Sequence, residues 1–285
     1  MIEVDTGLQD LKGRHPEWAP WLTVVQAVLV EAVDSKWEAV VPTCAQQSSK
    51  VPLLAEAKLN LNLGFVQRRL AQLIRIACKG GTLKMATLAK AAEADLDVLK
   101  LFKASLHQDS DQMKAMAATL GVDDEAFQAV TAILAVPFLQ ACNRRWGRSI
   151  NEGWTEGYCP VCGAWPAFAE VRGIERSRYL RCGRCGAGWQ AHCLYCPYCG
   201  MTNHEELVSL IPENSGSNCA IDACKRCLGY LKTFTKLQGS PPVKVILDDL
   251  GSVELDVVAV EQGYQRPQGA GFFLNATVSE NGAVG

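Results

Sequence analysis

The sequence predicts an α+β protein, helical in its first half and built of short strands in its second. In the segment 63–77, leucine and valine recur at helical spacing, and similar periodicity continues to about residue 156. From Tyr158 the periodicity stops, and glycine, aromatic residues and cysteine become frequent. Ten of the 13 cysteines lie between Cys159 and Cys227. The chain therefore divides into an α-helical N-terminal domain, residues 1–156, and a cysteine-rich C-terminal half.

The helical domain contains two strongly marked segments. The helix that begins at Leu63 is expected to end before Gly80-Gly81, because glycine commonly follows the last turn of a helix. A second helix is predicted over 125–148, and Pro137 should kink or restart it, since proline has no amide hydrogen for the helix interior. Shorter helices are predicted between them, over 83–92, 94–105 and 109–119.

The C-terminal half predicts small antiparallel ribbons. Short alternating segments lie at 167–171, 178–181 and 206–211. Residues 243–247 are a further strand candidate, and residues 252–260 form a closing helix or strand. Asp248 and Asp249 are expected on a solvated turn between them. The tail from Gln265 is rich in glycine and asparagine, so we expect it to fray.

Composition and charge exclude several classes of protein. The 285 residues carry a formal net charge of −2, so no general field favours nucleic acid or an anionic membrane. The first 18 residues lack the basic start and apolar core of a signal peptide. No uninterrupted apolar run approaches the roughly 18 residues of a membrane span. We therefore expect a cytoplasmic protein without stable membrane insertion.

The cysteines form two units of metal-ligand spacing. The first contains Cys159-Pro-Val-Cys162-Gly and Cys182-Gly-Arg-Cys185-Gly, with 19 residues between Cys162 and Cys182. This spacing is typical of a four-cysteine metal site. Two residues between cysteines let one tight turn direct both sulfurs at a single ion, and the following glycine adopts a positive φ without steric strain.

The second unit contains Cys196-Pro-Tyr-Cys199-Gly and Cys224-Lys-Arg-Cys227, with 24 residues between Cys199 and Cys224. We favour sequential pairing of the four motifs, because each unit then encloses a segment long enough for a hairpin. The alternative joins Cys182/Cys185 to Cys196/Cys199, which only ten residues separate. Sequential pairing gives a first module over 157–194 and a second module, with a C-terminal extension, over 195–285.

Two tetrahedral four-sulfur ions are therefore the expected cofactors. The predicted ligands are Cys159, Cys162, Cys182, Cys185, Cys196, Cys199, Cys224 and Cys227. A tetrahedral S₄ set suits zinc and also a single rubredoxin-type iron. Because such a site is closed, it commonly braces a small domain and performs no chemistry. Cys193 and Cys219 remain outside both units; we expect them to be structural, with a spare ligand or a reactive thiol as the alternative.

The order of these motifs resembles the formate dehydrogenase accessory protein family, FdhE. The resemblance lies in Gly157–Gly163, in Arg178–Cys182 and in Cys224–Lys232, where Tyr230-Leu231-Lys232 follows the last cysteine pair. It continues through Asp249–Asp256 to Arg266. The chain departs from the family pattern in Cys193, in Cys219 and in the segment 186–192.

The resemblance implies a fold, a partner and a role. The fold is a helical domain followed by two rubredoxin-like or zinc-ribbon modules, in which the eight cysteines hold iron or zinc. The role is that of a cytoplasmic, non-catalytic factor that helps to mature respiratory formate dehydrogenase. Its partner would be the catalytic subunit of that enzyme before export by the twin-arginine route.

Two other classes of function fit parts of the sequence. A nucleic-acid-binding zinc-ribbon protein is one, because five arginines gather in the first module, at Arg172, Arg176, Arg178, Arg181 and Arg184. The net charge of −2 speaks against it, and we expect no nucleic-acid partner. A redox protein, either a rubredoxin-type electron carrier or a thiol oxidoreductase, is the other. No nucleotide-binding or catalytic motif occurs, so we do not expect an enzyme.

Overall fold

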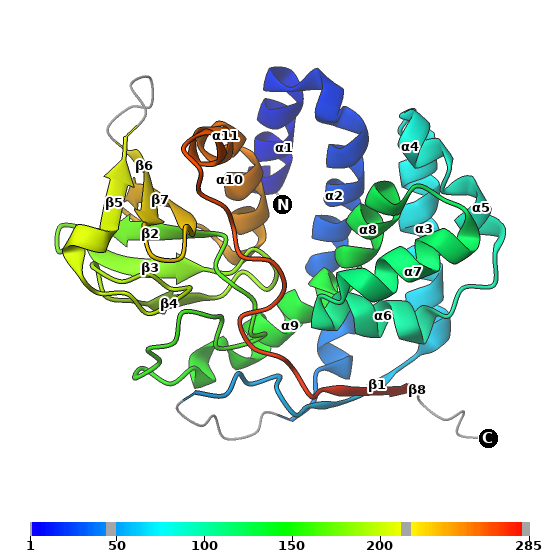
Figure 1. Ribbon diagram of the computed structural model, residues 1–285. Coiled ribbons are helices and arrows are strands. Elements are labelled where there is room, and N and C mark those ends of the chain that lie inside the picture. The colour runs from blue at the N-terminus through cyan, green and yellow to red at the C-terminus, as the bar shows by residue number, and fades with distance from the viewer. Residues whose placement is uncertain (1, 44–49, 212–217, 281–285) are drawn as a thin grey trace. The chain divides into compact units, whose positions relative to one another are not determined.

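The computed structural model describes residues 2–43, 50–211 and 218–280, which fall into two compact units (Figure 1). The helical unit comprises residues 1–43, 56–145 and 275–285, and the cysteine unit comprises residues 44–55 and 146–274. Among the described residues, 50–55 thus group with the cysteine unit and 275–280 with the helical unit. The α+β class predicted from the sequence is confirmed.

Helices form most of the helical unit. They are α1 (Ile2–Arg14), α2 (Ala19–Ala32), α3 (Leu63–Lys79), α4 (Leu83–Ala86), α5 (Ala89–Glu93), α6 (Val98–His107), α7 (Ser110–Leu120), α8 (Asp124–Ala132) and α9 (Val136–Trp146), with 3₁₀ turns at Pro16–Trp18 and Ser35–Val40. A further 3₁₀ turn, at Gly147–Ser149, follows α9 and belongs to the cysteine unit. The side chain of Asn62 accepts a hydrogen bond from the Phe65 amide and so caps α3. Its predicted apolar face, including Val66 and Leu70, is buried. The predicted break near Pro137 is found as the turn between α8 and α9.

The described part of the C-terminal tail, up to Glu280, ends in a paired strand, which corrects the prediction that this part frays. Strand β8 (Thr277–Glu280) pairs in parallel with β1 (Lys58–Leu61). Val278 is buried, as are Leu59 and Leu61 on the partner strand. The alternation of apolar and polar residues at 276–280 is a strand pattern, but it needs β1, more than 200 positions away, as its partner.

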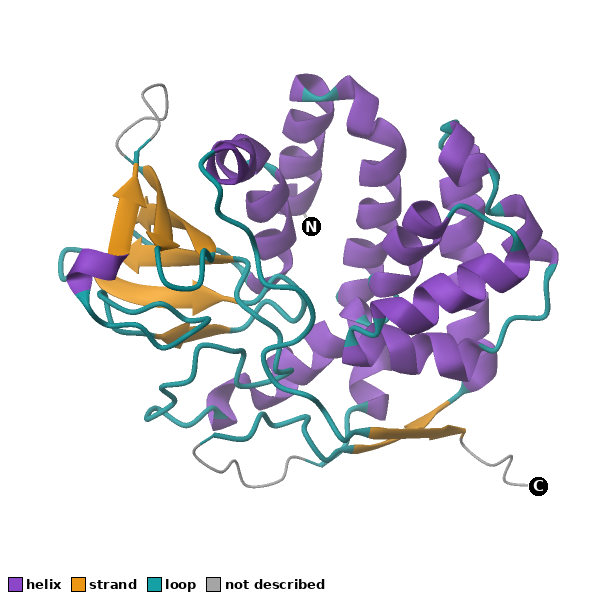
Figure 2. Ribbon diagram, in the orientation of Figure 1, coloured by secondary structure: helices purple, strands orange, loops and turns teal. Residues whose placement is uncertain are grey.

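One sheet organises the cysteine unit (Figure 2). Within the described residues its six strands run in the order β4-β3-β2-β7-β6-β5. They are β2 (Phe168–Arg172), β3 (Ser177–Arg181), β4 (Gly188–Gln190), β5 (Leu207–Leu210), β6 (Cys219–Cys224) and β7 (Tyr230–Lys236). The predicted ribbons are confirmed as the antiparallel pairs β2–β3 and β5–β6. A 3₁₀ turn, η4 (His204–Glu206), precedes β5.

The two predicted modules are head-to-tail repeats within this sheet. Each consists of a hairpin followed by a third strand that pairs with the hairpin's second strand. The repeats join through β2 and β7, which pair in parallel from Phe168↔Lys232 to Arg172↔Lys236. Because both strands lead away from a cysteine pair, the parallel register places both cysteine clusters at the same end of the sheet.

Two helices cover one face of the sheet. They are α10 (Val245–Leu250), after a 3₁₀ turn at Pro242–Lys244, and α11 (Val253–Glu261). Val245 and Leu255 pack there against Phe168, Ile221 and their neighbours. The strand predicted over 243–247 is wrong. Its β-branched residues favour a strand, but proline at the start favours a first helical turn and the packing of Val245 decides the outcome.

One apolar stretch tests the expectation of no membrane span. Residues Asp124–Ser149 are long and apolar enough to cross a membrane by length and composition. However, 72% of the most apolar part of this segment is buried inside the structure, and the core helix of a globular protein can be equally long and apolar. The stretch also includes the turn between α8 and α9, so we describe it as a core segment.

Candidate metal centres

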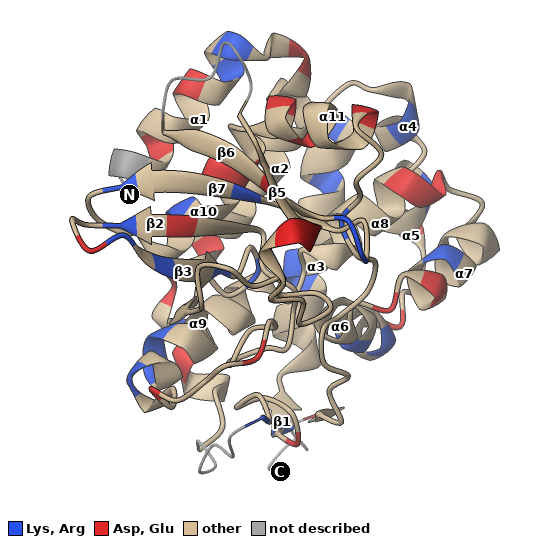
Figure 3. Cartoon of the chain, turned by 60° about the vertical axis from the view of Figure 1, so that its left-hand side comes forward, with Lys and Arg blue, Asp and Glu red and all other residues tan. Residues whose placement is uncertain are grey.

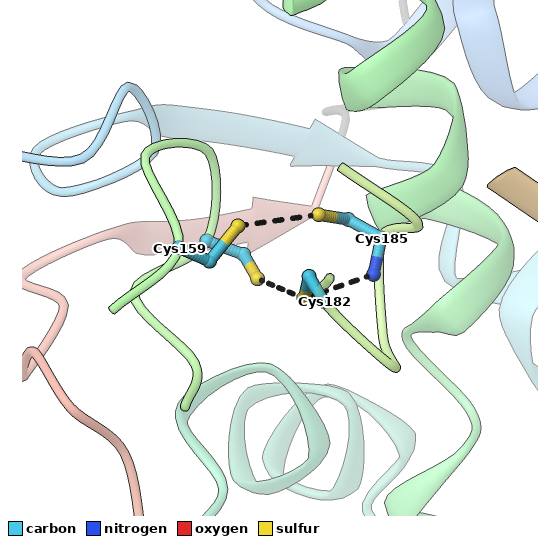
Figure 4. Close-up of side chains that lie close together, drawn as sticks. Cys159, Cys182 and Cys185 are labelled. Atoms are coloured by element: carbon cyan, nitrogen blue, oxygen red, sulfur yellow. Dashed lines mark hydrogen bonds between the residues drawn. The ribbon is translucent and has the colours of Figure 1, made fainter. Parts of the chain in front are cut away.

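The first cluster is a compact group of four buried sulfurs. Its members, Cys159, Cys162, Cys182 and Cys185, are each 0% exposed, and their sulfurs all lie within 4.8 Å of one another. The Sγ–Sγ distance is 3.4 Å between Cys159 and Cys185 and 3.6 Å between Cys162 and Cys182 (Figure 4). A tetrahedral ion with bonds of about 2.3 Å to sulfur needs sulfurs roughly 3.8 Å apart. The four positions therefore fit one soft divalent cation.

Local backbone geometry creates this arrangement. In the first turn, the Gly163 amide donates to the Cys159 carbonyl at 2.9 Å, with Gly163 at a φ of +71°. Gly186 repeats this geometry, at 3.0 Å from the Cys182 carbonyl and a φ of +75°. The Val161 amide also points at the Cys159 sulfur, at 3.4 Å. Such amides stabilise the negative charge of a metal-bound thiolate.

The second cluster has the same geometry but is partly open to solvent. Its sulfurs are separated by 3.6 Å for Cys196 and Cys227 and by 3.7 Å for Cys199 and Cys224, and they also form a group within 4.8 Å. Cys196 and Cys224 are buried, whereas Cys199 and Cys227 reach the surface. The structure thus groups the eight cysteines sequentially, and the alternative grouping of the middle pairs does not form.

The fourth cysteine turn departs from the other three. Leu228 occupies the place that glycine takes after the other cysteine pairs, and it adopts a φ of +57°. A side chain in this left-handed region carries roughly 1–2 kcal/mol of strain. Leu228 is 49% exposed, so its side chain contributes little burial.

Replacing Leu228 with glycine is expected to stabilise the cysteine unit by about 1 kcal/mol, because glycine adopts this φ without strain. Urea unfolding of the metal-loaded protein measures the change. Leu228→Ala is the matched control, since alanine loses the same exposed side chain but keeps the Cβ that causes the strain. A gain for alanine equal to that for glycine would contradict the explanation.

The acidity of the clustered thiols also indicates that a cation binds among them. Burial raises the pKa of the Cys159 and Cys185 thiols well above the usual value. Burial alone would raise the pKa of Cys182 too, but hydrogen bonds from the other three thiols hold it well below that value. In the second cluster, burial is the main cause that raises the pKa of Cys227 to about 11. Four thiolates therefore need a positive ion among them, and metal binding must release protons.

The two cysteines outside the clusters differ in exposure. Cys219 is half-buried in β6 and packs against the core of the sheet, as expected of a structural residue. Cys193 is exposed and lies in the loop before Cys196. Neither residue contributes a sulfur to the four-cysteine groups.

Alkylation should separate these classes of thiol. With metal-loaded protein and a small excess of iodoacetamide, we expect Cys193 to react first, because it is exposed and outside both clusters. The buried Cys142 should stay unmodified until the protein is denatured. Peptide mass spectrometry after short reaction times measures the order. Faster modification of Cys159 or Cys162 than of Cys193 would show that the first cluster is not protected by metal.

The arginines of the first module serve the structure of the sheet. Glu170, which is fully buried, accepts hydrogen bonds from Arg172 and Arg181, both at 2.9 Å from their Nε and Nη1 atoms respectively. Burial would raise the pKa of Glu170, but Arg181 and Arg172 hold it below the usual value. Arg178 donates to Asp222 at 3.2 Å and to the Tyr195 carbonyl at 2.8 Å. These three side chains are thus engaged within the fold. Along the chain, Lys and Arg positions are interspersed with Asp and Glu positions (Figure 3).

A second charged network was not anticipated from the sequence. The Lys232 ammonium, whose side chain is 0% exposed, lies 2.8 Å from Asp249 and 2.9 Å from Asp256. Arg266 contacts the same two carboxylates at 2.7 Å each, and Tyr230 donates to Asp256 at 2.8 Å. Asp249 therefore lies at the end of α10 in an ion-pair network, which corrects its assignment to a solvated turn. The network links β7 to α10, α11 and the chain beyond them.

Comparison with known proteins shows similarity to the FdhE family. The family model described as FdhE, C-terminal domain, matches residues 192–274, which include the second cluster and the Lys232 network. This part of the chain is thus similar to the C-terminal domain of FdhE proteins. The similarity to curated FdhE proteins extends over 117 to 146 residues in the cases below.

Two curated relatives and one solved structure illustrate the similarity. The chain is 32% identical over 117 residues to the FdhE homolog of Aquifex aeolicus (strain VF5), covering 40% of this chain and 41% of the relative. It is 33% identical over 146 residues to the FdhE homolog of Pseudomonas aeruginosa, covering 46% and 47%. The chain thus spans less than half the length of these relatives.

The crystal structure of the FdhE protein from Pseudomonas aeruginosa is similar over nearly the whole chain. The TM-score is 0.55 at 20% sequence identity, and the match covers 95% of this chain and 94% of the other. At this level of identity the match shows that the two chains share a fold. The FdhE fold is therefore present in both the helical and the cysteine unit.

Proposed function

We propose that this chain is a maturation factor for formate dehydrogenase, which binds the catalytic subunit of that enzyme in the cytoplasm and does not itself catalyse a reaction. The observation that carries the proposal is the match of residues 192–274 to the FdhE C-terminal domain. The FdhE homologues and the shared fold support the same role.

In this proposal the eight clustered cysteines hold two metal ions. The distances between the four sulfurs of each cluster are close to the edge lengths of a tetrahedral S₄ site. Both zinc and rubredoxin-type iron bind in such a site. Each ion would brace two cysteine turns and supply no open coordination position. The chain's own residues would then provide a fixed surface for a protein partner. A closed site offers no coordination position for a substrate, so the two ions would take part in no catalytic step.

A nucleic-acid-binding role receives less support than it did from the sequence. It depended on the arginines of the first module, and Arg172, Arg178 and Arg181 are engaged by Glu170, Asp222 and backbone carbonyls. The net charge of −2 also disfavours a phosphate backbone.

Deletion of the gene in its native host tests the proposed role. We expect anaerobically grown cells to lose formate-dependent dye reduction while retaining the catalytic subunit polypeptide. A plasmid copy of the wild-type gene should restore the activity, and a Cys193→Ala copy serves as the control for a cysteine outside both clusters. Undiminished formate dehydrogenase activity in the deletion strain would contradict the proposal.

A further inference from the structure

The two clusters differ in how the rest of the chain covers them. Around the first cluster, the Leu53 and Leu54 amides donate to the carbonyls of Pro160 and Val161, at 2.8 and 3.0 Å. The Phe272 amide donates to the Gly163 carbonyl at 2.9 Å. Segments from both ends of the cysteine unit therefore lie over the first cysteine turn.

The surroundings of the glycines in the cysteine turns show the same difference in coverage between the two clusters. A Cβ on Gly163 would lie 2.9 Å from the Phe272 carbonyl oxygen, and one on Gly186 would lie 2.5 Å from the Pro242 carbonyl oxygen. Both turns of the first cluster are thus packed against other backbone. A Cβ on Gly200, in the equivalent turn of the second cluster, would meet no atom within 4 Å. The Cys199–Gly200 corner faces open space.

A cavity also borders the second cluster. It has a volume of about 120 Å³ and lies between the loop 193–198 and strands β5, β6 and β7. The buried ligands Cys196 and Cys224 form part of its wall, and so does the exposed Cys193. Arg178, which is 4% exposed, contributes a buried Nε atom without a hydrogen-bond partner in the described structure. Two of the four predicted ligand residues of the second cluster therefore border this cavity.

We infer that the second cluster is an exchange site for a soft divalent cation, whereas the first cluster retains its cation. Cys199 and Cys227 reach the surface, and Cys196 and Cys224 border the cavity. A thiol or nitrogen chelator in solution can therefore compete for the ion without unfolding the chain. The exchange changes no oxidation state: each cysteine sulfur that leaves takes up a proton, and each thiol that replaces it gives one up. The inference rests on the proposed metal binding, but not on the proposed partner.

Release kinetics of zinc test this inference on the intact chain. Protein loaded with two zinc ions per chain is mixed with an excess of the chelating dye 4-(2-pyridylazo)resorcinol, and dye absorbance is followed at neutral pH. We expect two phases of equal amplitude whose rates differ by roughly tenfold or more, because release from a buried site requires local opening. A single phase that releases both ions would overturn the inference.

Thiol footprinting assigns each phase without altering the chain. N-ethylmaleimide is added at the end of the fast phase, and labelled cysteines are identified by peptide mass spectrometry. We expect label on Cys196, Cys199, Cys224 and Cys227 and protection of the first cluster. Labelling of the first cluster at this point would overturn the inference.

Variants give an independent assignment. Cys199→Ser should abolish the fast phase and leave the slow one, and persistence of the fast phase in this variant would contradict the inference. A wild-type protein that takes up no zinc or iron would overturn both this inference and the proposed metal binding. Equal release rates would overturn the inference alone, and neither result would bear on the partner.

Discussion

Replacing Cys162 with alanine is expected to reduce bound metal from two ions to one per chain and to unfold the cysteine unit locally. Cys162 is 0% exposed, and its sulfur lies 3.6 Å from that of Cys182. Structural zinc sites contribute about 10–16 kcal/mol in small zinc-binding peptides, so we expect a loss on the order of 5 kcal/mol or more. Elemental analysis measures the metal, and limited proteolysis measures the unfolding.

The proteolysis pattern gives this prediction a specific readout. New cleavage sites should fall within residues 146–274, which form most of the cysteine unit. Cys193→Ala is the matched control, because it also removes one thiol but lies outside both clusters and is exposed. We expect this control to retain two ions and the wild-type cleavage pattern. A Cys162→Ala protein with two ions and unchanged cleavage would show that the first cluster is not a metal site.

Replacing Lys232 with methionine is expected to destabilise the cysteine unit by about 3–5 kcal/mol, because it removes one partner from a buried ion pair. The Lys232 side chain is fully buried and contacts both Asp249 and Asp256. Methionine fills similar space but leaves these carboxylates with Arg266 as their remaining cationic partner. Urea unfolding of the metal-loaded protein measures the difference.

Lys244→Met is the matched control for that substitution. The Lys244 side chain is 40% exposed and lies 4.0 Å from Asp248, one helical turn away. Exposed pairs of this kind contribute about 0–1 kcal/mol, so the control should unfold close to the wild type. Equal losses for the two lysines would contradict the view that burial gives Lys232 its effect.

The cysteine clusters were predictable because their signals are local. The spacing within Cys159–Cys162 and the glycine that follows determine one turn, and four such turns recur along the chain. The hairpins β2–β3 and β5–β6 were predictable for the same reason, since each lies between two of these turns. The sequential grouping of the cysteine pairs then follows from the hairpins. In each unit the hairpin brings the second cysteine pair back beside the first.

Other features depend on residues far apart in the sequence. The parallel pairing of β2 with β7 joins Phe168 to Lys232, and no local pattern of either strand indicates this partner. Strand β8 likewise needs β1. Helix α10 was mistaken for a strand because Val243, Val245 and Ile246 are β-branched, whereas packing on the sheet favours the helix.

The charged networks could not be predicted from the sequence for a different reason. Lys232, Asp249, Asp256 and Arg266 resemble solvated surface residues when each is read alone, since such residues are mostly exposed in proteins. The full burial of Lys232 and the partial burial of the other three become evident only once β7 and the two C-terminal helices are placed together. All four residues lie in segments that resemble the FdhE family, but that resemblance does not indicate where their side chains lie.

Direct binding to the catalytic subunit of formate dehydrogenase tests the central claim most directly. The purified, metal-loaded protein would be mixed with the purified catalytic subunit from the same host and analysed by size-exclusion chromatography with mass detection. We predict a complex containing both chains, formed by the wild type and by Cys193→Ala but not by Cys162→Ala. Separate elution of two folded proteins, with two metal ions still bound to this chain, would contradict the proposed function.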